Sequence, residues 1–241
     1  MDDRIISVKR GTLLATTSLD AITRLANTSL EVPKPSNRNE LLNQGLRLVH
    51  ERGFNASSVR DIVEAAGAPQ GSFTNHFGSK EAFGLELIER YHDMTSAAVA
   101  ATLRNDGLPP LARLRAWMTN QLHYLRLHDM RRGCLYGNMA AEMSEHGEPI
   151  RSRIVEILAE NRASVKYCLD AALAAGEFEA TSPSAELAAF IVSSLQGAIL
   201  VAKAQRDPAP VQRFMKLLFT SVLRAPETKP AARTKKPVKR G

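Results

Sequence analysis

Few side chains in this sequence have the type and spacing for covalent chemistry. Cys134 lies in the segment RRGCLYGNMAAE, directly after Gly133 and close to Arg131 and Arg132. If a helix begins there, its N-terminal amides and the two arginines favour the nucleophilic thiolate, which would let Cys134 react with electrophiles. A free cysteine is also often a small buried hydrophobic residue, so packing is the alternative role of Cys134.

The remaining reactive groups lack the partners that metal binding or catalysis needs. His123 and His128 are five residues apart, which is off the i,i+4 spacing of a two-histidine metal face, and no carboxylate completes a ligand pattern. Cys168 is expected on an apolar helix face with no base near it in sequence. We therefore expect no metal and no cofactor. A cysteine-based, electrophile-processing enzyme built on Cys134 is kept as an alternative.

Non-covalent recognition is offered by the stretch GAPQGSFTNHFGSKEAF, residues 67–83. Phe73 and Phe77 are four residues apart, so both fall on one face of a helix that is too short to be stable alone. The other face carries neutral amide and hydroxyl side chains, namely Gln70, Ser72, Thr74 and Asn75. Such side chains match the donors and acceptors on base-pair edges in the major groove of DNA, and Gly71 allows a close approach.

The segments around this stretch favour a helix-turn-helix. Ser58 and Asp61 have the spacing of a capping box at the start of one helix, and Gly67 ends that helix. Pro69 suits the first position of the next helix, which leaves a three-residue turn between the two. Ser79 is expected to cap a long helix whose first amides, together with Lys80, suit a phosphate group.

Residues 38–91 resemble the DNA-binding domain of the TetR/AcrR family of transcriptional repressors. The resemblance rests on Gly53 and Phe54, on VRDIVEAAG (59–67) and on GSFTNHFGSKEAF (71–83). It implies double-stranded DNA as a partner. The residues expected to contact DNA are Ser58, Arg60, Gln70, Gly71, Ser72, Thr74, Asn75, His76 and Lys80. The family usually has a tyrosine where this chain has Thr74, so the contact of that ring with the DNA backbone is lost here.

Amphipathic segments separated by proline and glycine predict an all-α protein. We expect a disordered arm over 1–36, a helix-turn-helix domain over 37–96, a helical ligand-binding and dimerisation domain over 97–224, and a basic disordered tail over 225–241. The tail has six Lys/Arg and one Glu, a net charge of +5 within the +7 of the whole chain. It adds salt-sensitive attraction to phosphate or simply solubilises the chain.

Composition favours a cytoplasmic protein with no membrane segment. Two cysteines cannot form a disulfide framework, which favours a reducing compartment. Polar residues interrupt the longest apolar segment, residues 187–202, before it reaches the ~18 residues of a membrane span.

The family resemblance also assigns roles to the later helices. Residues 184–204 and 209–223 have wide apolar faces, and in this family the last two helices form a four-helix bundle with a second copy, giving a two-fold homodimer that matches a palindromic operator. An internal core is the alternative for these faces. The family binds its inducer in an apolar cavity among the middle helices. Candidate lining residues, each of which could instead be ordinary core, are Trp117, Tyr124, Cys134, Met139, Met143, Tyr167 and Phe190.

The segment around Cys134 is similar to the GCL segment in the branch of the family that includes the N-ethylmaleimide reductase repressor, which senses electrophiles through a cysteine. We therefore expect a homodimeric repressor that a small-molecule or electrophile inducer releases from its operator. The alternatives on the same fold are an activator and a non-specific DNA-binding protein.

Overall fold

The computed structural model describes residues 37–142, 147–180 and 182–225. Over these ranges the chain forms helices and no strand, which confirms the all-α prediction for the described residues. The helices are α2 (Asn37–Arg52), α3 (Val59–Ala65), α4 (Ser72–His76), α5 (Lys80–Ala101), α6 (Pro110–Leu127), α7 (Leu135–Glu142), α8 (Glu148–Ala174), α9 (Ser184–Gln205) and α10 (Ala209–Leu217). A π-helical turn, η1 (Leu218–Val222), continues α10.

Local sequence signals explain where the first helices begin and end. Gly53 has a φ of +99°, which an L-residue rarely adopts, and its N–H donates to the Val49 carbonyl at 2.9 Å, so α2 stops there. Ser58 caps α3, because its hydroxyl accepts from the Asp61 N–H at 3.1 Å while its own N–H donates to the Asp61 carboxylate at 2.9 Å. The glycine at the end of α2 and the capping box of α3 therefore determine where the helix-turn-helix begins.

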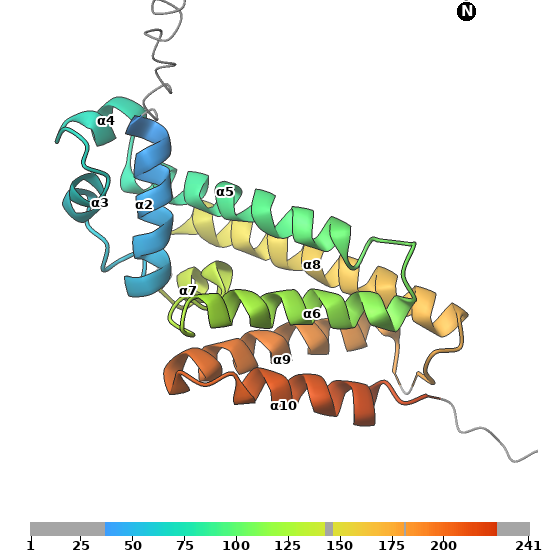
Figure 1. Cartoon of the computed structure of the whole chain (residues 1–241). Coiled ribbons are helices and arrows are strands. Elements are labelled where there is room, and N and C mark those ends of the chain that lie inside the picture. The colour runs from blue at the N-terminus through green and yellow to red at the C-terminus, as the bar shows by residue number, and fades with distance from the viewer. Residues whose placement is uncertain (1–36, 143–146, 181, 226–241) are drawn as a thin grey trace, which may run out of the picture. The chain divides into compact units, whose positions relative to one another are not determined.

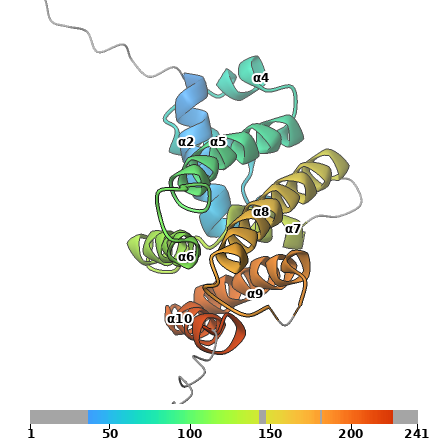
Figure 2. The ribbon, with the colours of Figure 1, turned by 90° about the vertical axis from the view of Figure 1, so that its right-hand side faces the viewer.

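The helices group into a head and a body. Helices α2, α3 and α4 lie together at the start of α5, and we call these four elements the head. Helices α6 and α8–α10 form the body, in which α8 packs against α9, α6 and α5, and α10 packs against α9 and α6. In the two perpendicular views, α4 and α10 lie on opposite sides of the molecule (Figures 1 and 2).

Two hydrophobic clusters hold these groups together. The body cluster includes Trp117 of α6 and Leu195 of α9. The head cluster includes Phe73 and Phe83, but it also takes in Tyr136 of α7 and, among others, Leu135, Met139, Ile150, Ile154 and Ile157 of α7 and α8. The core of the head therefore continues into residues that follow it by more than forty positions in sequence.

Within the described residues, one helix, α9, has the length and apolar composition of a helix that could cross a membrane. Its buried side chains, such as Leu187, Ile191 and Leu195, belong to the body cluster. Packing inside the body therefore accounts for part of this composition.

Some sequence-based expectations lie outside the described residues. These are the arm over 1–36, the tail from residue 226 onward and the candidate pocket residue Met143.

Candidate nucleic-acid interface and effector pockets

Three phenylalanines hold α4 in place. The ring centroids of Phe73 and Phe77 are 5.1 Å apart, those of Phe73 and Phe83 are 5.0 Å apart, and those of Phe77 and Phe83 are 4.8 Å apart. All three rings are buried, and the guanidinium of Arg38 lies 5.6 Å from the Phe77 centroid. A five-residue helix is not stable alone, so this cluster supplies the stability that α4 lacks.

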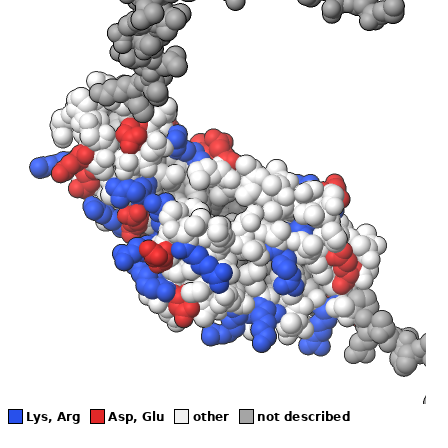
Figure 3. Space-filling view, in the orientation of Figure 1, with Lys and Arg blue, Asp and Glu red and all other residues white. Residues whose placement is uncertain are grey.

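The outer side of α4 presents uncharged polar side chains. Gln70, Thr74, Asn75 and His76 are exposed, and the surface over α4 is white in Figure 3, where charged residues are coloured. The Thr74 hydroxyl donates to the Gly71 carbonyl at 3.1 Å, which fixes its rotamer. The space around Gly71 is open, so a partner can approach its backbone closely.

Two details of this interface differ from the sequence prediction. The helix begins at Ser72, so Pro69 and Gln70 belong to a longer turn in which the Ser72 N–H donates to the Pro69 carbonyl at 2.9 Å. Ser72 itself is only 6% exposed, and its hydroxyl accepts from the Asn37 amide at 3.4 Å. Ser72 therefore supports the helix from inside and is not part of the exposed row.

Two of the residues expected to contact DNA, Ser58 and Lys80, have other interactions in this structure. Ser58 is occupied with its capping box, whereas Arg60 is exposed. The Lys80 ammonium lies 4.8 Å from the centroid of the Phe54 ring and donates to the Asn55 carbonyl at 3.4 Å. Burial lowers the pKa of Lys80. Lys80 must therefore leave Phe54 before it can reach a phosphate group.

A carboxylate at the end of α7 joins that helix to the loop between α2 and α3. The Glu142 side chain accepts from the backbone N–H of Phe54 at 3.2 Å and of Asn55 at 2.8 Å. The Asn55 side-chain amide donates in return to the Glu142 carbonyl at 3.0 Å. A Cβ at Gly53 would collide with the Glu142 carboxylate, so glycine is needed there for space as well as for its φ. We call this set of contacts the Glu142 clamp.

A pocket of about 400 Å³ opens beside the clamp, between the end of α2, α7 and α9. We call it the outer pocket. Its lining residues are Glu51, Arg52, Gly53, Gly133, Cys134, Gly137, Asn138, Ala141, Glu142, Gln196, Gly197, Ile199, Leu200 and Lys203. Its volume falls in the range of small-molecule sites.

A second cavity lies deeper, among α5, α6, α8 and α9. This inner cavity measures about 20 Å³, room for one water molecule. Its lining residues are Tyr91, Thr95, Val99, Trp117, Gln121, Cys134, Tyr136, Asn161, Val192, Leu195, Gln196 and Ile199. Cys134, Gln196 and Ile199 line both spaces, and the Gln196 amide donates to the Cys134 sulfur at 3.3 Å. Cys134 precedes Leu135, the first residue of α7, as predicted.

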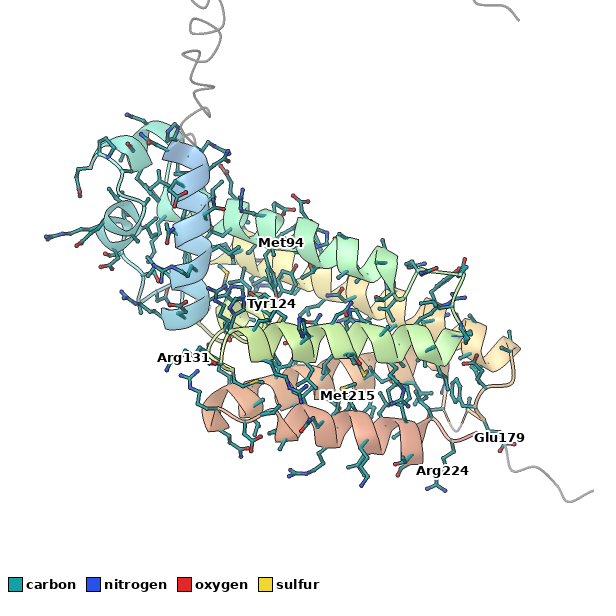
Figure 4. All side chains as sticks on the ribbon, in the orientation of Figure 1. Met94, Tyr124, Arg131, Glu179, Met215 and Arg224 are labelled. Atoms are coloured by element: carbon teal, nitrogen blue, oxygen red, sulfur yellow. The ribbon has the colours of Figure 1, made fainter. Side chains whose placement is uncertain are left out.

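The other candidate pocket residues are divided among several environments. Trp117 lines the inner cavity, whereas Met139 is fully buried in the head cluster. Tyr124 is half-buried and extends from α6 toward the lower end of α2 (Figure 4), where its ring centroid lies 6.2 Å from that of His50. Met139 and Tyr124 line neither the outer pocket nor the inner cavity.

Tyr167 and Phe190 face outward, contrary to the prediction that they line a cavity. The Tyr167 hydroxyl donates to the Asp106 carboxylate at 2.8 Å, and the Arg104 guanidinium lies 4.4 Å from its ring centroid. Phe190 is 49% exposed on α9. An amphipathic pattern identifies an apolar residue but does not say whether its helix face meets a cavity, the core or the surface.

His50, at the end of α2, is a buried titratable group that no pattern in the sequence singled out. It is 1% exposed, and its ring meets the Tyr91 ring edge-on, with 5.0 Å between centroids. Among the described residues, neither of its ring nitrogens has a hydrogen-bond partner. Burial first, and then the charge of Arg132, lower the pKa of His50 to about 3. The ring is therefore neutral near neutral pH.

The second cysteine packs as expected. Cys168 is fully buried, and its thiol donates to the Pro110 carbonyl at 3.0 Å. Burial raises the pKa of this thiol to about 11, so it is not a nucleophile near neutral pH.

Sequence reasoning missed most of the outer pocket. Its polar lining comes from α2, α7 and α9, which lie far apart in sequence, and includes Glu142, Gln196 and Lys203. The available signal was the set of small residues Gly133, Gly137 and Gly197, because small side chains on facing helices leave space for a ligand.

A short polar helix held by a buried aromatic cluster, in a helix-turn-helix joined to a helical body, defines a DNA-binding regulator. A family model described as bacterial regulatory proteins, tetR family, matches residues 41–87. A second, described as a tetracyclin repressor-like C-terminal domain, matches residues 110–218. The chain therefore belongs to the TetR family of DNA-binding transcriptional regulators and is not an enzyme.

Similar proteins carry names of the same kind. The chain is 31% identical over 190 residues to the transcriptional repressor DhaR of Mycobacterium sp., a match that covers 79% of this chain and 94% of DhaR. It is 33% identical over 174 residues to the transcriptional regulator AcuR of Cereibacter sphaeroides, covering 72% and 80% respectively. It is 30% identical over 115 residues to the repressor NemR of Escherichia coli, covering 48% and 58%.

Solved structures agree with this assignment. The regulatory protein TetR from Rhodobacter sphaeroides matches with a TM-score of 0.72 and 32% identity, over 75% of this chain and 95% of that chain. The reduced form of E. coli NemR matches with a TM-score of 0.72 and 25% identity, over 79% and 98%.

Proposed function

We propose that this regulator is a homodimeric repressor that binds a palindromic operator and leaves it when an inducer binds the body. The observation that carries the proposal is the exposed row of Gln70, Thr74 and Asn75, held outward by the buried phenylalanines behind α4. Amide side chains can form two hydrogen bonds with one base edge, which makes them suitable for direct readout. In bacteria the operator lies in the cytoplasm, where we place the protein.

Selection of bound sequences from random DNA tests this proposal. We expect one palindrome to be enriched, and Gln70→Ala and Asn75→Ala each to cost roughly 1–3 kcal/mol at a defined base pair. Asn120→Ala is the matched control, because it removes an exposed amide from α6, away from the head. If no palindrome were enriched with or without inducer, the repressor proposal would be wrong.

The homodimer is supported by the apolar surface of the last two helices. Phe190, Leu200 and Val201 of α9 and Leu217 of α10 are 49%, 61%, 44% and 52% exposed. Exposed apolar side chains on two adjacent helices are typical of an interaction surface. A two-fold axis there would present two heads to two half-sites of a palindrome.

Two kinds of inducer fit the release step. The covalent candidate acts on Cys134, which lines both the outer pocket and the inner cavity. As a thiolate, its sulfur would bond to the β-carbon of an α,β-unsaturated carbonyl compound, and the electron pair of the C=C bond would move to the α-carbon. Water would protonate the α-carbon, and the proton released earlier by the thiol would neutralise the resulting hydroxide. The second candidate is a reversible ligand that binds in the outer pocket or fills and enlarges the inner cavity.

Mass spectrometry of the peptide that contains Cys134 separates these candidates. A covalent inducer increases the mass of that peptide in proportion to loss of operator binding, and Cys134→Ser then stays bound to the operator. An inducer that releases Cys134→Ser as readily as the unchanged protein acts reversibly, and Cys134 is then only a packing residue.

A further inference from the structure

We propose that the outer pocket is a non-covalent binding site for a small molecule with one anionic group and an apolar body, in which Lys203 is the counter-ion. The proposal names a ligand class and the residue that recognises the ligand. Its regulatory consequence rests on the proposed function, that is, on repression through an operator. The binding step itself does not depend on the identity of the operator.

The carboxylates of the outer pocket already have partners. Glu51 forms ion pairs with Arg47 at 3.3 Å and with Arg132 at 3.5 Å. Glu142 accepts two backbone N–H groups in the clamp. A cationic ligand would have to displace one of these sets of contacts, so the carboxylates do not favour one.

Lys203, a cation of the same pocket, is less well compensated. Among the ion pairs of the described residues, none includes Lys203, and its hydrogen bond to the His50 carbonyl is long, at 3.5 Å. Burial first, and then repulsion by Arg206, lower the pKa of Lys203, whereas Glu142 opposes this shift. A half-buried ammonium with one weak acceptor is stabilised by an anion that reaches it.

The surroundings of the pocket attract anions as well. A neighbouring depression of about 370 Å³ is lined by Arg126, Arg131 and Arg206, together with Asp129, Met130 and Pro208. In Figure 3, Lys and Arg side chains lie along α10, and around the end of α2 they alternate with Asp and Glu side chains. The three arginines outnumber the one carboxylate of this depression, and a local excess of positive charge raises the concentration of anionic ligands and their rate of association.

Apolar side chains next to Lys203 in the same pocket account for the apolar body. Ile199 and Leu200 of α9 and Ala141 of α7 contribute apolar surface, and Gly137 and Gly197 leave space between these helices. Asn138 and Gln196 can donate to a second oxygen of the anionic group. A compact aromatic or branched monocarboxylate has this combination of features.

The site adjoins the Glu142 clamp, which links binding to the head. An anion bound at Lys203 neutralises part of the ammonium charge that attracts Glu142, and it also repels the Glu142 carboxylate in the same pocket. Glu142 then holds the N–H groups of Phe54 and Asn55 less firmly, and the loop that leads into α3 is released. Ligand binding is therefore expected to weaken operator binding.

Calorimetry on the full chain without DNA tests the pocket, using benzoate, phenylacetate and hexanoate as probes and their amides as neutral counterparts. We expect the carboxylates to bind and the amides to bind at least about tenfold more weakly, as expected for loss of one charge-assisted hydrogen bond. Lys203→Met should abolish this preference, and Lys203→Arg should restore it. Lys166→Met is the matched control, since it removes an ammonium on α8 that is paired with Asp170.

Three results would overturn the assignment: no carboxylate binds at millimolar concentration, the amides bind equally well, or Lys203→Met keeps the preference for carboxylates. Operator binding without any probe separately tests the proposed function, so its failure is distinguishable from failure of the pocket. With an operator in hand, a bound probe that leaves operator affinity unchanged refutes the link through Glu142.

Discussion

Replacement of Phe73 by alanine should remove DNA binding by unfolding α4 rather than by removing a base contact. Phe73 is 3% exposed and pairs with two other rings at 5.1 and 5.0 Å. Loss of the buried ring costs about 1.5–3 kcal/mol of transfer free energy, and each aromatic pair adds about 0.5–1.5 kcal/mol. The total, about 2.5–6 kcal/mol, spans the ~3–5 kcal/mol that is typical of Phe→Ala in a core.

A five-residue helix is not stable without such packing, so α4 should unfold when the ring is lost. We expect Phe73→Ala to lower the midpoint of urea unfolding and to weaken binding to every DNA sequence, as measured by fluorescence anisotropy. Thr74→Ala is the matched control, because its exposed side chain can change readout but not stability by more than ~0.5 kcal/mol. A Phe73→Ala protein with unchanged unfolding free energy and unchanged operator affinity would refute the role of the aromatic cluster.

The remaining predictions concern packing, pH and assembly. A Cβ at Gly45 would overlap the Phe83 ring, so Gly45→Ala should lower the free energy of unfolding by about 1–3 kcal/mol through overpacking, offset by ~1 kcal/mol of helix propensity. Gly78→Ala is the control, because the space around Gly78 is open and its free energy of unfolding in urea should be nearly unchanged. Because the folded state holds the pKa of His50 near 3 and an unfolded histidine titrates near 6.5, unfolding takes up a proton below pH 6.5. Stability should therefore fall by about 2 kcal/mol between pH 7.5 and pH 5 from this group alone, and His50→Phe should flatten that part of the pH profile; an equally steep profile in the variant contradicts this. Phe190→Glu should shift the protein from dimer to monomer in sedimentation velocity, because Phe190 is 49% exposed on α9 and lines neither the outer pocket nor the inner cavity; a dimer that survives the change would place the interface elsewhere.

The sequence predicted the helices well because their ends are marked locally. The capping box at Ser58 and the glycine at position 53 act within a few residues, and both were found where expected. The start of α4 was misplaced, because Pro69 is compatible with either a helix start or a turn and only the fold decides between them. Burial of Ser72 could not be anticipated, since its partner Asn37 lies 35 residues away.

The pockets were harder to predict than the helices. Amphipathic spacing identified Trp117 and Tyr167 equally, but Trp117 lines the inner cavity whereas Tyr167 bonds to Asp106 on the surface. The outer pocket depends on how α2, α7 and α9 meet, and no local pattern encodes that meeting. Lys203 in particular resembles an ordinary solvent-exposed lysine until its helix is placed against α2.

The shared hydrophobic cluster determines where this regulator could be cut and recombined with a relative. A chimera joined near residue 96 would separate Phe83 and Leu87 of α5 from Tyr136, Met139 and Ile150, which complete their packing. Each half would then expose apolar side chains selected for a partner it no longer has. A chimera that transfers α7 and the first turns of α8 together with α2–α5 keeps that cluster whole. The part of the chain that must be exchanged to transfer operator specificity is therefore larger than the helix-turn-helix itself.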